Sequence, residues 1–193
     1  MKTLIDISPE RTGTAFRMFE VFPKIKDATV IRGMHLVQYK YIKPCPEFAT
    51  PYEKLDLLKK KYPDACFLYV DRDRETWVVS LYNHWVRHGG TLSFETWYDN
   101  VMNKQIFITD RLIGYAEEIF GDNFYLMRFE DMVVNPNVEF NKMLSYFGLK
   151  PIVVNNNGHN SSLSDRQIGL NRFLNKVHNR YFVVRRLMNN LKS

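Results

Sequence analysis

Short apolar runs alternate with helix-like segments along most of this 193-residue chain, and this alternation constrains the fold more than any other feature. Runs typical of buried strands occupy 3–7, 28–31, 66–70 and 124–129. Helical patterns are predicted over 13–22, 52–61, 75–87, 94–102 and 106–120, then after Asn135-Pro136 and from about Ser164 onward. Such alternation predicts an α/β fold with three layers, in which helices flank a central, mostly parallel sheet. Ligands of such folds bind beyond the carboxyl ends of the strands.

Length and composition predict a single domain over 1–193 with a sizeable core, because 45% of the residues are hydrophobic. The formal net charge of +6 favours anionic ligands without specifying their class. The two cysteines, Cys45 and Cys66, have no CxxC partner or nearby histidine pair, so we expect reduced thiols rather than a zinc site or a disulfide framework.

No apolar run is long enough to cross a bilayer, so we expect no membrane span. The first predicted strand begins almost at Met1, which leaves no room for a signal peptide. The expected location is therefore cytoplasmic.

The stretch PERTGTAF, which follows the first predicted strand, combines glycine, hydroxyl groups and a cation in a turn from strand to helix. Gly13 allows backbone N–H groups to approach an oxyanion, and the helix that follows adds partial positive charge. Thr12 and Thr14 add hydroxyl donors, while Arg11 adds a permanent cation. The lysine of the magnesium-nucleotide pattern GxxxxGK[ST] is missing. The turn is thus either a phosphate loop of another kind or an ordinary N-capped βα turn.

A second basic segment follows the CFLYV strand. Arg72 leaves the end of that strand, and Ser80 follows eight residues later on the next predicted helix. A guanidinium and a hydroxyl at these positions can be aimed at one phosphate group. The alternative is a solvated charged turn, DRDRE, with Ser80 as a neutral helix residue.

The order of PERTGT, RDRETWVVSLYNH and YLMRFEDMVVNPNVEFNKMLSYFGL resembles the sulfotransferases that use 3'-phosphoadenosine 5'-phosphosulfate (PAPS). The resemblance spans roughly residues 3–149 and implies a P-loop-like nucleotide-binding architecture. The family carries a PKSGTT or PRSGTT loop for the 5'-phosphosulfate, an arginine and serine eight residues apart for the 3'-phosphate, and a YEDL segment followed by FLGL. It implies PAPS as donor and 3'-phosphoadenosine 5'-phosphate (PAP) as product, with no metal.

Carried over residue by residue, the resemblance assigns Arg11, Thr12, Gly13 and Thr14 to the 5'-phosphosulfate loop. Ala15 replaces the second hydroxyl residue of that loop, although its backbone N–H is retained. Arg72 and Ser80 match the 3'-phosphate pair. Arg74 replaces a proline that is common in the family, and Phe129-Glu130-Asp131 matches a segment with a structural role.

The resemblance also implies a catalytic base. Cytosolic members carry a histidine in a T-H-L-P segment after the second strand, and His35 in VIRGMHLVQ lies at a similar point. We expect His35 to accept the acceptor's proton and Arg11 to stabilise the departing phosphate; the alternative is that His35 only packs in a loop. His84 and His88 are lesser candidates. Arg166 and Arg172 are candidates for completing the 3'-phosphate pocket, with a solvated helix face as the alternative.

The predicted function is transfer of a sulfuryl group to a hydroxyl or amine of a carbohydrate or small-molecule acceptor, without nucleic acid as a partner. One alternative is a P-loop-type nucleotide kinase, whose magnesium carboxylate would be Asp71. The other is a non-catalytic basic module that binds anions such as nucleic acid or sulfated glycan. The sequence carries no signal for the acceptor's identity or the oligomeric state.

Overall fold

The computed structural model describes residues 1–9, 11–31, 51–155 and 166–177, and for 101–110 it describes the backbone alone. Within these residues, four parallel strands form one sheet in the order β2-β1-β3-β4. The predicted parallel α/β fold is confirmed, and the bounds of each strand lie within one residue of its predicted apolar run. The strands are β1 (Lys2–Asp6), β2 (Ala28–Ile31), β3 (Cys66–Asp71) and β4 (Phe124–Arg128).

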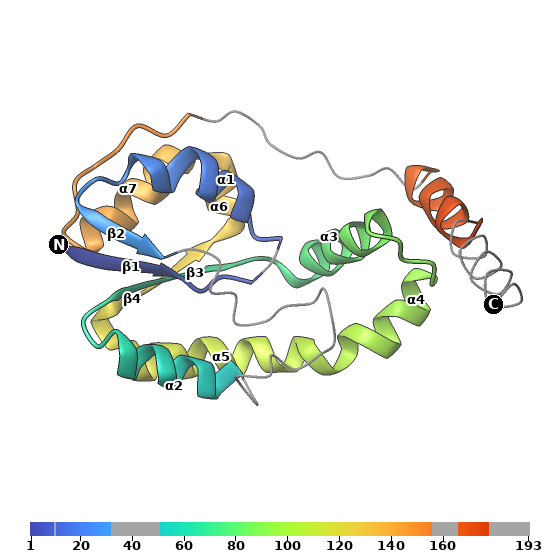
Figure 1. The fold of residues 1–193 in the computed structure, drawn as a ribbon, viewed down its shortest axis with the longest axis horizontal. Helices are drawn as coiled ribbons and strands as arrows, with labels where there is room; N and C mark the ends of the chain where they lie inside the picture. Colours follow the sequence, from blue (N-terminus) through green and yellow to red (C-terminus); the bar gives the residue numbers. More distant parts are fainter. Residues whose placement is uncertain (10, 32–50, 156–165, 178–193) are drawn as a thin grey trace, which may run out of the picture.

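Helices cover both faces of the sheet (Figure 1). One face carries the helical run after β1 together with the helices that follow β4, whereas α2 and α5 cover the other. The helices are α1 (Thr14–Phe16), the π-helix η1 (Arg17–Val21), the 3-10 helix η2 (Phe22–Lys24), α2 (Pro51–Lys61), α3 (Arg74–Arg87), α4 (Phe94–Trp97), the π-helix η3 (Tyr98–Met102), α5 (Asn103–Phe120), the 3-10 helix η4 (Gly121–Asn123), α6 (Phe129–Val134) and α7 (Pro136–Tyr146).

The two central strands are buried on both faces, which explains why they read as continuous apolar runs. In β1, Leu4 belongs to the core on the α7 face and Ile5 to the core on the α5 face. In β3, Leu68 and Phe67 divide in the same way. This alternation follows from the two-residue period of a strand. The carboxyl ends of β1 and β3 lie side by side, because the two strands are parallel, hydrogen-bonded neighbours.

A third apolar cluster lies between α3, α4 and the helical segment 166–177. Trp77, Tyr82 and Trp97 are buried there, and Ile168 of the 166–177 helix packs against them. Asn175 adds hydrogen bonds from its amide nitrogen to the backbone oxygens of Val86 at 2.8 Å and Gly90 at 2.9 Å. These contacts attach the 166–177 helix to the end of α3.

Several boundaries differ from the sequence-based expectation, and three of the differences bear on the site or its neighbours. The helices expected over 94–102 and 106–120 form one uninterrupted helical run, because no glycine or proline separates them. The strand expected to reach Phe129 ends at Arg128, and Phe129 begins the short helix α6, which was not predicted. The helix expected to end at Pro23 continues to Lys24, since Pro23 lies in the first turn of η2, where its missing N–H is not needed.

The predicted signals at the two ends of α7 are confirmed. The side chain of Asn135 caps α7 by accepting a hydrogen bond from the backbone nitrogen of Val138, and Pro136 is the first residue of that helix. Gly148, just after α7, has a φ of 62°.

Cys66 is a buried free thiol, and burial raises its pKa. None of the helices in the described ranges is long and apolar enough to span a membrane.

Candidate functional site

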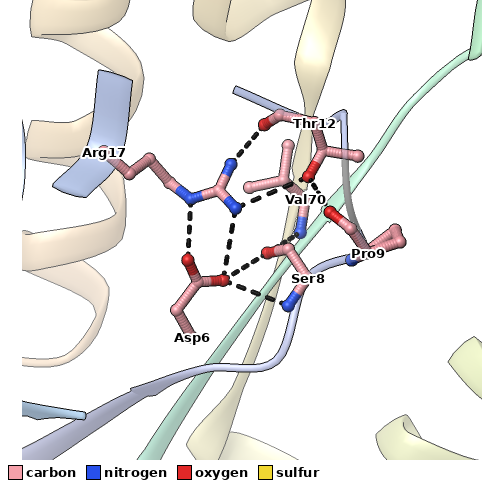
Figure 2. A network of polar contacts seen from close by, with 6 residues as sticks. All are labelled: Asp6, Ser8, Pro9, Thr12, Arg17 and Val70. Carbon is pink, nitrogen blue, oxygen red and sulfur yellow. Dashed lines mark hydrogen bonds and ion pairs between the residues drawn. The ribbon is translucent and has the colours of Figure 1, made fainter. Parts of the chain in front are cut away.

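The loop that follows β1 is supported by a buried ion pair beneath it (Figure 2). The Nε atom of Arg17 lies 2.9 Å from Oδ2 of Asp6, and both side chains are almost fully excluded from solvent. The Nη1 atom of Arg17 also donates to the backbone oxygen of Thr12. Arg17 therefore connects the end of β1 to the turn that carries the candidate phosphate-binding residues.

A second set of hydrogen bonds joins this loop to β3 (Figure 2). The Ser8 hydroxyl donates to Oδ1 of Asp6 at 2.5 Å and accepts from the backbone nitrogen of Val70 at 2.9 Å. The Thr12 hydroxyl is also buried and donates to the backbone oxygen of Pro9 at 2.7 Å. In this structure the Thr12 hydroxyl therefore donates its hydrogen bond within the loop, and this bond stabilises the turn.

Two residues of this loop, Arg11 and Gly13, have positive φ angles. Gly13 has a φ of 79°, and Arg11 has a φ of 66°, which is uncommon for a residue with a side chain. A Cβ atom on Gly13 would lie 2.6 Å from Cε of Met132, on α6. The left-handed conformation therefore favours glycine here, whereas the overlap with Cε, the far end of the flexible Met132 side chain, can be relieved by a shift of that side chain.

The first turn of the helix after this loop begins at Thr14 and Ala15, as the phosphate-loop hypothesis requires. No side chain of a described residue caps it at Gly13, and the earliest backbone bond of the helix runs from the nitrogen of Arg17 to the oxygen of Gly13. The hydroxyl of Thr14 is buried and has no hydrogen-bond partner among the residues that the structure describes. A helix start without a side-chain cap fits an anionic ligand.

Arg72 and Ser80 both contact Arg11, so the structure brings the two predicted anion-binding segments together. The Nε atom of Arg11 donates to the hydroxyl of Ser80 at 3.2 Å. The Nη1 atom of Arg72 donates to the backbone oxygen of Arg11 at 2.9 Å. Two guanidinium groups and a buried hydroxyl therefore share one region at the carboxyl ends of β1 and β3.

Residues of α6, which sequence reasoning treated only as a structural segment, hold the β3–α3 connection in place. The guanidinium carbon of Arg72 lies 4.3 Å from the centre of the Phe129 ring. The carboxylate of Glu130 accepts a hydrogen bond of 3.0 Å from the backbone nitrogen of Asp73, and Asp73 in turn caps α3 through the backbone nitrogen of Thr76. The match of FED to the family segment was the available signal for this role.

The electrostatics at this edge favour an anion. Partial burial lowers the pKa of Arg72, Glu130 opposes this effect, and the adjacent charge of Arg11 lowers the pKa of Arg72 further. Two cations that repel each other in this way are stabilised by a ligand with several negative charges. Asp71 lines a small pocket at this edge of the sheet. Desolvation raises the pKa of its carboxyl, Glu130 adds to the rise, and Arg74 opposes it. The pocket is lined by Pro9, Thr12, Tyr69, Asp71, Arg72, Arg74 and Trp77.

The remaining predicted site residues lie elsewhere. His35, the candidate base, falls within 32–50 and so outside the described residues. His84 and His88 lie at the end of α3 with ring centres 4.1 Å apart. Arg172 lies close enough to Tyr82 and Glu95 to act on both electrostatically, and Arg166 is exposed. In the part of the chain that is described, no three His, Cys, Asp or Glu residues are arranged to hold a metal ion.

Comparison with known proteins adds family and fold. The sequence profile of the sulfotransferase family matches residues 5–152, which is most of the chain. No curated protein matches the sequence. The fold is similar to that of a sulfotransferase from Alicyclobacillus acidocaldarius, with a TM-score of 0.57 and 13% identity over 83% of this chain and 87% of that one.

The fold is also similar to that of the mouse sulfotransferase SULT7A1, a structure complexed with PAP. The TM-score is 0.52 and the identity 14%, and the match covers 88% of this chain but only 62% of the mouse chain. At these identities the two structures support the fold alone.

Proposed function

Since the chain belongs to the sulfotransferase family, we propose that it transfers a sulfuryl group from PAPS to a hydroxyl or amine of a carbohydrate or small-molecule acceptor. The proposal is carried by one observation, the meeting of Arg72 and Ser80 with Arg11 at the carboxyl ends of β1 and β3. The presence of PAP in the mouse sulfotransferase structure supports the choice of donor.

The residues at this edge divide between the two anionic ends of the donor. Arg11, Gly13 and the backbone N–H groups of Thr14 and Ala15 are assigned to the 5'-phosphosulfate, with Thr12 shaping the loop. The start of α1 fits this assignment, because no side chain of a described residue caps it at Gly13. Arg72 and Ser80 are assigned to the 3'-phosphate, which suits a guanidinium beside a hydroxyl.

The proposed reaction is an in-line displacement at sulfur. The acceptor oxygen or nitrogen forms a bond to sulfur while the bond from sulfur to the 5'-phosphate oxygen breaks, and PAP leaves. His35 takes the proton of the acceptor, and Arg11 with the start of α1 stabilises the charge that develops on the departing phosphate. The protein contributes position and charge, as in phosphoryl transfer, and no metal is part of this proposal.

Binding of PAP without magnesium tests the donor assignment directly. At a concentration about 100 times its Kd, a ligand stabilises the folded state by about 2.7 kcal/mol, which for a chain of this size raises Tm by roughly 5–10 °C. We expect this rise with PAP in the presence of EDTA. The matched control is adenosine 5'-phosphate, which lacks only the 3'-phosphate and should give a much smaller rise.

Two outcomes would contradict the proposal. A response to magnesium-ATP that exceeds the response to PAP would indicate a nucleotide kinase. Binding that falls steeply with salt for any polyanion, and that does not distinguish PAP from adenosine 5'-phosphate, would indicate a basic anion-binding module. Given PAP binding, a screen of acceptors with PAPS carrying radiolabelled sulfate then identifies the acceptor class.

A further inference from the structure

The helix 166–177 has two opposite faces, and only one of them contacts the rest of the described protein. Ile168, Arg172 and Asn175 lie on the face that packs toward α3 and α4. The opposite face carries four large apolar side chains at helical spacing. They are Leu170, Phe173, Leu174 and Val177, which are 58%, 63%, 51% and 51% exposed. We call these four residues the outer stripe.

Exposure of this kind differs from the scattered apolar residues of an ordinary surface. Spacings of three, four and seven residues place all four side chains of the outer stripe on one side of the helix. A continuous apolar stripe left exposed beside a docked face marks a surface that another body covers. The helix 166–177, drawn in red in Figure 1, lies at the end of the molecule beyond α3 and α4.

The net positive charge of the chain comes from the segment 166–193, which begins with this helix. Residues 166–193 contain no Asp or Glu and seven cations, Arg166, Arg172, Lys176, Arg180, Arg185, Arg186 and Lys192. The other 20 of the 27 Lys and Arg residues lie before residue 166, as do all 21 Asp and Glu residues, so the charges of that part of the chain nearly cancel. The net positive charge thus belongs entirely to this last segment, and the nucleotide-binding part of the chain is close to neutral.

We propose that the outer stripe, together with the exposed cations Arg166 and Lys176 of the same helix, docks the protein on the surface of an anionic lipid bilayer. A basic helix that presents leucine and phenylalanine on one face inserts that face among lipid headgroups, while its cations attract anionic lipids. A nucleic acid or a sulfated glycan would be recognised by the cations but gives no partner to the outer stripe. The outer stripe therefore favours the bilayer among the polyanions that this charge can attract.

Flotation of the full-length chain with lipid vesicles tests the proposal. We expect the protein to float with vesicles of phosphatidylcholine and phosphatidylserine, to remain unbound with phosphatidylcholine alone, and to detach in high salt. The double variant Phe173→Ser/Leu174→Ser should lower the partition coefficient about tenfold or more, because two apolar anchors are lost. It should keep the Tm of the wild type, since both side chains are exposed.

The matched control is Val134→Ser/Val153→Ser, which removes two apolar side chains that are 82% and 74% exposed outside this helix, and it should bind vesicles like the wild type. Absence of flotation with anionic vesicles overturns the proposal. So does equal binding by the two double variants, or tighter binding to duplex DNA that Phe173→Ser/Leu174→Ser leaves unchanged. Sedimentation that shows a dimer which only the Phe173→Ser/Leu174→Ser variant dissociates would assign the outer stripe to a second copy instead.

Discussion

Arg72 donates a hydrogen bond of 2.9 Å from Nη1 to the backbone oxygen of Arg11, although 61 positions separate the two residues. The contact is possible because β1 and β3 are adjacent parallel strands, so their following loops leave the sheet at the same edge. It joins the loop assigned to one end of the donor to the segment assigned to the other end. A change at either residue should therefore be measurable in nucleotide binding.

The first prediction concerns the 3'-phosphate pair. Arg72→Ala and Ser80→Ala should each weaken PAP binding roughly 10–100-fold, because each removes a hydrogen bond to a charged group, typically about 1.5–3 kcal/mol. Arg166→Ala, which removes an exposed cation from the 166–177 helix, is the control and should leave PAP affinity nearly unchanged. Calorimetric titration of the three variants with PAP measures the difference. Equal losses in all three would refute the assignment of Arg72 and Ser80.

The second prediction concerns the turn at Gly13. Gly13→Ala should destabilise the fold and weaken PAP binding, because alanine in the left-handed region costs about 1–2 kcal/mol and its Cβ would meet Cε of Met132 at 2.6 Å. Urea denaturation and PAP titration measure both effects. The control is Gly114→Ala in α5, where a Cβ meets nothing within 4 Å and helix propensity should raise stability slightly. A Gly13→Ala variant as stable as the wild type would contradict the left-handed backbone at this position.

The pattern of apolar residues was sufficient to predict the strands, because each central strand is buried on both faces and its sequence shows this locally. The cap and the first residue of α7, Asn135 and Pro136, were predictable for the same reason, since a helix start depends on neighbouring residues. Helix α6 was missed because no glycine or proline separates it from β4, so that Phe129 reads as the last residue of the strand. The acidic pair Glu130-Asp131, in the first turn of α6, was the signal that favoured a helix start.

The contacts that support the candidate site could not be predicted from neighbouring residues in the sequence. Arg17 lies in what reads as an ordinary amphipathic helix, yet it is fully buried against Asp6. Only the packing of η1 on the sheet brings the two together, and no spacing rule relates a strand residue to a helix residue across a turn. The hydrogen bond from Arg11 to Ser80 is similarly tertiary, since it depends on which strands are neighbours in the sheet.

The third prediction follows from this buried pair. Arg17→Met keeps the length of the side chain but leaves the carboxylate of Asp6 without its cation, and removing one partner of a buried pair costs about 3–5 kcal/mol. Urea denaturation should show a loss of this size, together with weaker PAP binding, because Arg17 also holds the backbone of Thr12. The control is Lys142→Met, which breaks the pair of Lys142 and Glu139 on the surface of α7. A loss as small as in the control would show that the buried pair does not support the loop.

The fourth prediction concerns pH. Desolvation raises the pKa of Asp71 above its ordinary value of 3.8, so the folded protein holds this proton more strongly than the unfolded chain does. Stability from this group is present at low pH and is lost as pH rises through the raised pKa. Asp71→Asn should therefore stabilise the protein at pH 7, with a gain that shrinks as the pH approaches 3.8.

Urea denaturation of wild type and Asp71→Asn over this pH range gives the gain directly. The PAP affinity of the same variant distinguishes a sulfotransferase from a nucleotide kinase. In a sulfotransferase, loss of a negative charge beside Arg72 should not weaken the binding of a polyanion such as PAP. A nucleotide kinase that uses Asp71 for magnesium would instead lose its magnesium-ATP binding. A variant that is less stable than the wild type at pH 7 would contradict the proposed desolvation of Asp71.

The fifth prediction concerns the proposed base. His35→Ala should bind PAP like the wild type but transfer sulfate to the screened acceptor roughly 10²–10⁴-fold more slowly, the usual contribution of a general base. The wild-type rate should fall at acidic pH, where a histidine base is protonated, and the variant should lose this dependence. His88→Ala is the control, because Nδ1 of His88 lies 2.8 Å from the backbone oxygen of His84 at the end of α3. Unimpaired transfer by His35→Ala, with its pH dependence intact, would assign the base to another residue while leaving the nucleotide site unaffected.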